Sequence, residues 1–135
     1  MYILDSCLCI ELMRGHLPKT MQMMRQSRPE LFGLPFIVEA ELLTGAEKSS
    51  NPQKFRLLTE EFLQPFPRVA FDSNCARAYA DISAALERTG KKIGPNDLII
   101  AATAVANNAV LLSGNVNEFK RVPGLKLENW EEIEF

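Results

Sequence analysis

The feature that most constrains the fold is an apolar helix that leads straight into a short apolar strand. Residues 94–96 (Gly-Pro-Asn) form a loop signal, and the proline fixes φ at the first turn of the helix that follows. Residues 98–106 have almost no polar face, and a helix that is apolar all round is buried. Asn107 and Asn108 end it, and residues 109–112 have the length of a strand. We therefore expect this helix and strand in the centre of the fold.

Asp97 lies in the first turn of this apolar helix. A carboxylate in that place is stabilised by the helix dipole, whereas burial without a partner is costly. Two interpretations stay open at this point. The first is an N-terminal cap, provided by Asn96 or Asp97. The second is a carboxylate held against a cation, together with other carboxylates brought to the same place.

The length of 135 residues predicts a single domain over residues 1–135, with 47% hydrophobic and 24% charged residues as in ordinary soluble globular proteins. No apolar run approaches the ~20 residues that span a bilayer. The apolar opening stops at Asp5 and has no basic flank, which excludes a signal peptide. Three cysteines without a Cys-x-x-Cys pair argue against a disulfide framework or a zinc site. We expect a cytoplasmic protein without a membrane segment.

The net charge of -2 excludes a generic basic nucleic-acid binder. A nucleic-acid site would have to depend on bound metal or on local basic clusters. Each cluster taken alone favours a solvated face, and the candidates are Arg88 with Lys91 and Lys92, Lys120 with Arg121, and Arg14 with Lys19, Arg25 and Arg28.

Strand-like and helix-like segments alternate along the chain. Strands are expected at residues 2–4, 31–34, 69–71, 109–112 and 126–128, and helices at residues 7–14, 19–28, 37–47, 55–63, 75–88 and 98–106. Ser6 is the expected cap of the first helix. This alternation predicts an α/β domain with a mainly parallel sheet. In such sheets the site lies beyond the carboxyl ends of the strands, where Asp5 and residues 113–115 fall.

Acidic side chains gathered at that edge would favour one kind of chemistry. If Asp5, Asp97 and a third acid meet, they cannot all stay ionised in a dry site without a cation. Ligands with oxygen donors alone suit Mg²⁺ or Mn²⁺ rather than zinc. Such a site activates water and clamps a phosphoryl oxygen, which predicts phosphodiester hydrolysis. Seventeen acidic residues also offer accidental sets, so Glu41 as a solvated helix face, Asn115 as a turn residue and Glu118 as a helix-start carboxylate stay open.

Five segments in order carry a resemblance over essentially the whole chain. They are residues 3–6 (ILDS), 41–46 (ELLTGA), 94–101 (GPNDLIIA), 115–119 (NVNEF) and 121–130 (RVPGLKLENW). Together, at this spacing, the sequence resembles the PIN-domain ribonucleases, and among them the VapC-type toxins of bacterial toxin–antitoxin pairs.

The resemblance implies a PIN-like α/β/α sandwich with a mainly parallel five-stranded sheet, and a Mg²⁺- or Mn²⁺-dependent endoribonuclease. It implies that Asp5 and Asp97 are the main metal ligands and that Glu41 is a further acid in the same pocket. Many relatives carry an acid where Asn115 stands, while VapC-like members pair an Asn there with an acid at the place of Glu118. We therefore expect Asn115 and Glu118 to share the fourth site position.

Three smaller positions bear on the same site. Ser6 and Ser113 fall where the family often has Thr or Ser that supports the acids. Cys7 departs from the family, which commonly has an Asn there that supports the first Asp. The core acids are retained, so we expect an active enzyme. Two alternatives are a catalytically silent PIN-like binding scaffold and a haloacid-dehalogenase-like phosphatase, although the latter needs a second Asp where Cys7 stands.

The resemblance also implies partners. They are a structured RNA such as tRNA as substrate, a cognate antitoxin, and a second copy of the chain in a homodimer. Two basic pairs flank the expected site and are candidates for binding RNA: Lys91 with Lys92, and Lys120 with Arg121. An antitoxin segment would need an apolar groove; the candidates, each of which a plain core role also explains, are Met21, Met23, Met24, Leu58 and Phe62.

Overall fold

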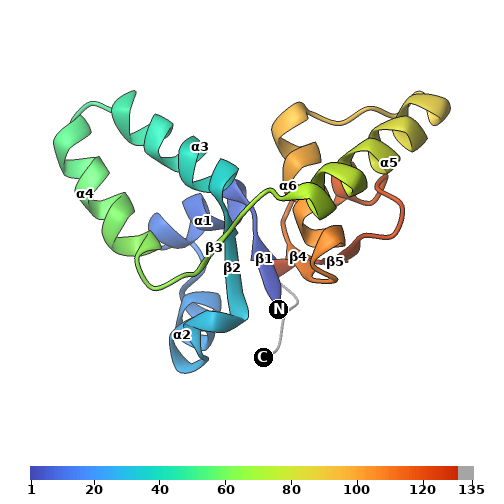
Figure 1. Ribbon diagram of the computed structural model, residues 1–135. Helices are drawn as coiled ribbons and strands as arrows, with labels where there is room; N and C mark the ends of the chain where they lie inside the picture. Colours follow the sequence, from blue (N-terminus) through green and yellow to red (C-terminus); the bar gives the residue numbers. More distant parts are fainter. Residues whose placement is uncertain (131–135) are drawn as a thin grey trace.

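The computed structural model describes residues 1–130, so the last five residues of the domain predicted over 1–135 lie outside the described part. The strands are β1 (Tyr2–Leu4), β2 (Phe32–Pro35), β3 (Arg68–Val69), β4 (Val110–Leu112) and β5 (Lys126–Glu128) (Figure 1). The helices are α1 (Ser6–Met13), α2 (Pro18–Gln26), α3 (Phe36–Glu47), α4 (Pro52–Leu63), α5 (Ser73–Thr89), α6 (Pro95–Ala106) and α7 (Val116–Phe119), with a 3₁₀ turn at Pro29–Leu31.

All five strands form one sheet in the order β3-β2-β1-β4-β5, and each neighbouring pair is parallel. The predicted α/β fold with a five-stranded parallel sheet is therefore confirmed. The chain leaves β1 toward β2 on one side and returns much later to β4 on the other. The carboxyl end of β1 is thus a switch point of the sheet, which is where α/β proteins place their ligands.

Helix α6 is buried as its composition predicts. Leu98 and residues 100–104 are shielded from solvent, and most of them belong to the hydrophobic core that the sheet shares with its helices. The apolar surface around the helix is covered because α6 packs beside α5 and also contacts α3. Its first turn, with Asp97, is therefore fixed relative to the carboxyl ends of β1 and β4.

Two helix starts differ from expectation. The N-cap of α1 is Asp5, whose Oδ1 accepts from the backbone N–H of Leu8 at 2.8 Å, rather than Ser6. Ser6 is already inside the first turn, which leaves its hydroxyl free to reach another helix. The N-cap of α6 is Gly94, without a side-chain cap, so the capping interpretation of Asp97 is wrong.

Strand β3 is shorter and begins one residue earlier than residues 69–71. The backbone N–H of Leu34 donates to the carbonyl of Pro67 at 2.9 Å, which draws Arg68 into the sheet. Phe71 is exposed, and Asp72 directly after it caps α5 by accepting from Cys75 N at 3.0 Å. The chain therefore turns away from the sheet before residue 71.

The helices form two arms above the sheet. In Figure 1 the α3–α4 pair spreads to one side of the strands and the α5–α6 pair to the other, and β1 points between them. Arg68 ties the first arm to the sheet, because it bonds Glu39 at 2.7 Å and donates to the carbonyls of Leu63 and Phe66. Within residues 1–130, no helix combines the length and apolarity that crossing a bilayer requires.

A candidate active site at the carboxyl edge of the sheet

Asp5 lies directly after β1 and only 2% of it is exposed. Both carboxylate oxygens accept hydrogen bonds, Oδ1 from Leu8 N and Oδ2 from the hydroxyl of Ser113. Burial raises the pKa of Asp5 to about 6, the two hydrogen bonds oppose that rise, and the charge of Glu41 adds to it. The carboxyl group is therefore fixed in orientation and poorly compensated in charge.

Ser113 reaches Asp5 because of strand register. Leu4 pairs with Leu112, so the residues that follow these two partners leave neighbouring strands side by side. Ser113 is fully buried, and its Oγ both donates to Asp5 and accepts from the backbone N–H of Asn115 at 2.9 Å. The predicted supporting serine thus connects β1 to the loop after β4.

Glu41 approaches from α3. Its Oε1 accepts from the hydroxyl of Ser6 at 2.7 Å, so a carboxylate of α3 holds the first residue of α1. The charge of Glu41 raises the pKa values of both Asp5 and Asp97, which places it within electrostatic reach of each. Glu39 lies on another face of the helix, as the spacing predicts, and pairs with Arg68.

Asp97 approaches from the first turn of α6 and is partly buried. Burial raises its pKa to about 7, and the neighbouring carboxylates of Glu118, Glu41 and Asp5 add to the rise. Gly94 leaves room for these groups, since a Cβ there would lie 3.8 Å from Asp97 Oδ2 and 3.9 Å from Glu118 Oε1. The two acids therefore meet directly over the start of α6.

Asn115 and Glu118 act as a pair. Oε1 of Glu118 accepts from the backbone N–H of Gly94 at 2.9 Å, and Oε2 accepts from Asn115 Nδ2 at 2.5 Å. Burial raises the pKa of Glu118, but these hydrogen bonds and the charge of Arg121 outweigh it, so the pKa is lowered overall. Glu118 therefore stays ionised beside an Asp97 that resists ionisation.

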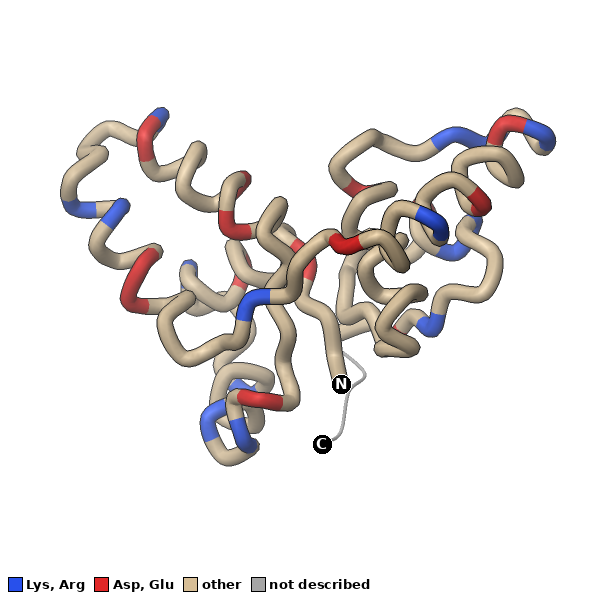
Figure 2. Tube along the Cα trace, viewed as in Figure 1, with Lys and Arg blue, Asp and Glu red and all other residues tan. Residues whose placement is uncertain are grey.

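The structure brings all five predicted site residues to one edge of the sheet, from β1, α3, α6 and the β4–α7 segment: Asp5, Glu41, Asp97, Asn115 and Glu118. In Figure 2 acidic positions lie at the end of β1 and near the starts of α3 and α6, on both sides of the gap between the arms. Sequence reasoning missed the amides of Leu8 and Gly94, which carry no side-chain signal.

Cys7 lies in the first turn of α1 and its residue is exposed. Partial burial of its thiol, followed by the charges of Asp5 and Asp97, raises the pKa of this group. Cys7 makes no hydrogen bond to Asp5 in the described structure. The backbone N–H of Leu8 and the hydroxyl of Ser113 hold Asp5 instead. The departure from the family at this position therefore leaves the first aspartate anchored.

The site fits a hard divalent cation by its donor set, which consists of carboxylate, amide and hydroxyl oxygens. Within residues 1–130, no three Asp, Glu, His or Cys side chains converge into a complete ligand set for a metal. Mg²⁺ is held by one or two carboxylates, with water and substrate phosphate completing its shell. Asp5 and Asp97 are two acids of raised pKa whose mutual repulsion a cation would relieve.

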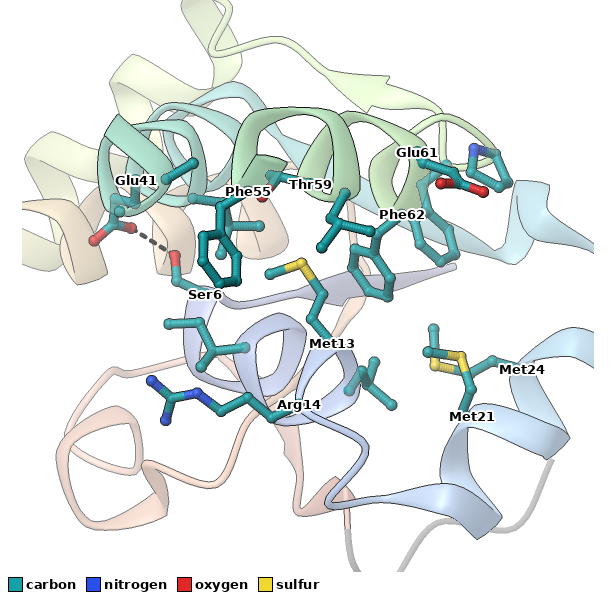
Figure 3. A pocket seen from close by; sticks show the side chains of 18 of the residues that line it. Ser6, Met13, Arg14, Met21, Met24, Glu41, Phe55, Thr59, Glu61 and Phe62 are labelled. Atoms are coloured by element: carbon teal, nitrogen blue, oxygen red, sulfur yellow. Dashed lines mark hydrogen bonds between the residues drawn. The ribbon is translucent and has the colours of Figure 1, made fainter. Parts of the chain in front are cut away.

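A groove of about 1130 Å³ opens beside the acids. Residues of α1, α2, α3 and α4 line it, and Glu41 belongs to both the groove and the acid cluster. The Ser6–Glu41 hydrogen bond lies at one end, and Met21, Met24 and Phe62 lie at the other (Figure 3). Of the five predicted groove residues, Met21, Met24, Leu58 and Phe62 line it, whereas Met23 does not. Met24 is also part of the core, as the alternative interpretation held.

Residues 2–125 match the family model of the PIN domain. The chain belongs to the PIN-domain family. Among its relatives is Ribonuclease VapC2 of Rickettsia felis, with 33% identity over 97% of this chain and 98% of that protein. The tRNA(fMet)-specific endonuclease VapC of Salmonella typhimurium is 36% identical over 67% of this chain and 68% of that protein.

Chains from solved VapBC structures agree with this chain over nearly their whole length. A chain of DNA-bound VapBC from Salmonella typhimurium superposes with a TM-score of 0.90 at 29% identity, covering 96% of this chain and 97% of that one. VapBC2 from Rickettsia felis bound to a promoter DNA fragment gives 0.86 at 32% identity, covering 96% and 98%. The recognition of the sequence as a VapC-like PIN domain is confirmed.

Proposed function

We propose that this PIN-domain protein is a metal-dependent endoribonuclease and the toxin of a toxin–antitoxin pair. The observation that carries the proposal is that Asp5, Glu41 and Asp97, from three separate elements, lie within electrostatic reach of one another at the switch point of a sheet. The resemblance to proteins named VapC ribonucleases supports the same conclusion. The haloacid-dehalogenase-like alternative is not favoured by these relatives.

Asp5 and Asp97 are the proposed ligands of Mg²⁺ or Mn²⁺. Such an ion, when bound, polarises a phosphoryl group and lowers the pKa of water. Asp5 cannot rotate, because Leu8 N and Ser113 hold both of its oxygens. Glu41 and Glu118 add negative charge that attracts the cation, and Glu118 fixes the start of α6 through Gly94. These residues together would bind the cation and fix its position, so the pocket is preorganised before substrate arrives.

The decisive experiment is cleavage of total tRNA by the purified protein with Mg²⁺, with Mn²⁺ and with EDTA. We expect metal-dependent cutting in the wild type and a loss of at least about 100-fold in Asp5→Asn and Asp97→Asn, as for groups that position charge at a reacting centre. Asp81→Asn is the matched control, because Asp81 is an exposed acid on α5 that pairs with Arg77.

Three outcomes would decide differently. Cutting that survives both Asp5→Asn and Asp97→Asn would contradict this site. Cutting unchanged by EDTA would contradict the role of the metal. A folded wild type that neither cleaves RNA nor shifts its melting temperature with Mg²⁺ would favour the catalytically silent scaffold.

For the substrate we propose a structured RNA such as tRNA, cut within a loop, where unpaired bases are accessible. The support is that relatives in Salmonella typhimurium and Shigella flexneri are named tRNA(fMet)-specific endonucleases. Two basic pairs lie together beside the acids, since Arg121 Nη1 donates to the carbonyl of Lys92 at 3.2 Å. Figure 2 shows one of them as a basic stretch in the α5–α6 loop. We define the basic ridge as Lys91, Lys92, Lys120 and Arg121.

Charge reversal tests the basic ridge. Lys91→Glu with Lys92→Glu is expected to weaken RNA binding and to reduce the steepness with which affinity falls as salt rises, because fewer counterions are released. Lys126→Glu is the control, since Lys126 lies on β5 and bonds Asn108 instead. Binding is measured with catalytically inactive Asp97→Asn protein at several salt concentrations. An unchanged salt slope would contradict the role of the ridge.

We further propose that the groove binds a segment of a cognate antitoxin. The support is its apolar lining next to the acids, and the likeness to chains solved as VapBC complexes. An amphipathic helix suits it, with apolar side chains against Met21 and Phe62 and an Arg aimed at the Glu41 end. Folding of such a segment on the groove would cover the carboxylates and inhibit cleavage.

Leu58→Lys tests this groove without touching the acids, because Leu58 is 48% exposed on α4. We expect loss of antitoxin binding with RNA cleavage unchanged. Leu57→Lys is the control, because Leu57 is 67% exposed and does not line the groove. Equal loss in both variants would contradict the groove as the antitoxin site. The proposed homodimer depends on the family resemblance, and light scattering of the purified protein tests it.

A further inference from the structure

The loop that carries Ser113 and Asn115 has an aromatic cover. The benzo ring of the Trp130 indole fills the space that a Cβ on Gly114 would occupy, so any larger residue at position 114 would meet Trp130. Trp130 is partly buried and packs against the hydrophobic core. The glycine between the two site residues is therefore explained by the ring above it rather than by its backbone angles.

The end of β5 brings Trp130 to this place. Leu112 pairs with Glu128, and the backbone N–H of Ser113 donates to the carbonyl of Glu128 at 3.1 Å, which extends the ladder to the first residue of the loop. Two residues later the chain folds over Gly114. On its far side the carbonyl of Trp130 accepts from Thr20 Oγ1 of α2 at 3.5 Å. The indole is thus held from β5 and α2.

Contacts run without a gap from this ring to the proposed metal ligands. Gly114 lies between Ser113, which donates to Asp5, and Asn115, whose amide N–H donates back to Ser113 Oγ. Asn115 Nδ2 then donates to Glu118, which accepts from Gly94 N at the start of α6. A shift of the loop away from β1 would release Asp5 and Glu118 together.

We propose that Trp130 is a positioning residue for the carboxylate site, and that it acts through Gly114 to hold Ser113 and Asn115 in place. Its consequence for catalysis rests on the proposed nuclease function, whereas its effect on the loop does not. Removal of the ring opens this side of the exposed Gly114 further to solvent and lets Ser113 and Asn115 sample other positions. Groups that orient the ligands of a metal typically change affinity or activity by about 10- to 100-fold.

The first test is amide hydrogen exchange in the metal-free protein, which needs no enzymatic activity. In Trp130→Leu we expect exchange of the Asn115 amide to quicken at least about tenfold, with Trp130→Phe close to wild type. Tyr79→Leu is the matched control, because Tyr79 is a partly buried aromatic residue on α5 that packs edge-on against Phe71. Exchange at the wild-type rate in Trp130→Leu would overturn the proposal.

Kinetics of RNA cleavage supply the second test. In Trp130→Leu we expect kcat to fall by about 10- to 100-fold with KM nearly unchanged, and Trp130→Phe to recover most of the loss. In a Ser113→Ala background, Trp130→Leu is expected to add little, because both act on Asp5 by the same route. A fall in kcat no larger than that of Tyr79→Leu would overturn the role in catalysis.

Gly114→Ala gives a reciprocal test that does not remove the ring. The new Cβ collides with the indole, so Gly114→Ala alone should quicken exchange of the Asn115 amide. The double variant Gly114→Ala with Trp130→Leu should quicken it by less than the sum of the effects of the two single variants. Full additivity would overturn the proposed contact. If the wild type cleaves no RNA, the exchange measurements still decide, and the nuclease proposal fails separately.

Discussion

The hydroxyl of Ser113 donates to Oδ2 of Asp5, and the two residues are 108 positions apart in the sequence. The pairing of β1 with β4 makes this contact, because it sets the residues after Leu4 and Leu112 side by side. Most of the chemistry proposed for the site depends on Asp5 keeping the orientation that this bond gives it.

Ser113→Ala should weaken both the fold and the activity. Asp5 would keep only the bond from Leu8 N, and the half-buried Asn115 N would lose its acceptor, the fully buried Ser113 hydroxyl. A buried group left without its partner costs about 1–3 kcal/mol, which urea denaturation would measure. We expect cleavage to fall by about 10- to 100-fold. Ser113→Thr keeps the hydroxyl, and a loss equal to that of Ser113→Ala would argue against the bond.

Metal-free protein should lose stability as pH rises from 5 to 8. The pKa of Asp5 is about 6 in the folded protein against an ordinary 3.8, so the folded state binds more protons than the unfolded state in this window. Asp97, with a pKa of about 7, acts in the same direction. Glu118 has a lowered pKa, so its contribution falls away only below its ordinary value of 4.5.

The Asp5 shift corresponds to about 3 kcal/mol of lost stability once the pH is above both pKa values. Chemical denaturation in EDTA at pH 5 and pH 8 measures the part that is lost above pH 5, which is about 1.4 kcal/mol for Asp5. Asp5→Asn should reduce it, since the amide has no charge to bury, and should leave the contribution of Asp97, whereas Asp81→Asn should leave the whole change as in the wild type. A wild type that is more stable at pH 8 than at pH 5 would contradict this reading of the buried carboxyl.

Added Mg²⁺ should reverse that loss. The cation favours the ionised carboxylates, and a ligand that binds only the folded state at 100 times its Kd stabilises by about 2.7 kcal/mol. The melting temperature should therefore rise more with Mg²⁺ at pH 8 than at pH 5. A thermal-shift assay on the wild type and Asp97→Asn compares the two. A shift of the same size in both proteins would mean that Asp97 does not bind the metal.

Asn115→Asp should place two carboxylates against each other. The Asn115 side chain donates to Glu118 Oε2 at 2.5 Å, and an acid there would lose the donor and add a like charge. We expect a loss of about 1–3 kcal/mol at pH 8 in EDTA, partly restored by Mg²⁺. Asn115→Ala removes the donor without the charge. Equal stability of the Asp and Ala variants would show that charge has no part in this pairing.

Cys7 should react slowly with alkylating agents although its residue is exposed. Burial of the thiol and the nearby charges of Asp5 and Asp97 raise its pKa, and the thiolate is the reactive form. We expect iodoacetamide at pH 7.5 to modify it more slowly than glutathione, and faster in Asp97→Asn. Mass spectrometry separates it from Cys9 and Cys75, which are buried. A rate above that of glutathione would contradict the expected environment.

Local pattern was enough to predict most of the elements. The apolar composition of residues 98–106 required a buried helix, and α6 is one. The strands at residues 2–4 and 126–128 lie where they were predicted. In each case the prediction depended only on residues close together in the sequence, because their spacing and composition indicate which side chains are buried. The parallel character of the sheet then followed from the alternation of strands and helices, whereas the order of the strands did not.

The contacts that shape the site were beyond such reasoning. Either Asp5 or Ser6 could cap α1 by residue type, and the choice was decided by Glu41 on α3, which engages the Ser6 hydroxyl. The bond from Gly94 N to Glu118 links segments that no periodicity relates. Trp130 shows the same limit, because its place over Gly114 depends on how β5 pairs with β4. These contacts are set by the register between strands that lie far apart in the sequence, which local patterns do not predict.

The pairing of β4 between β1 and β5 also orders events in time. During synthesis β1 emerges first, and its edge toward β4 stays open until residues 110–112 have been made. Until then Asp5 lacks Ser113, and Glu118 does not yet exist to meet Gly94. A chain that stops before residue 110 therefore has only part of the acid cluster. Synthesis of residues 110–118 is therefore the step that completes the acid cluster.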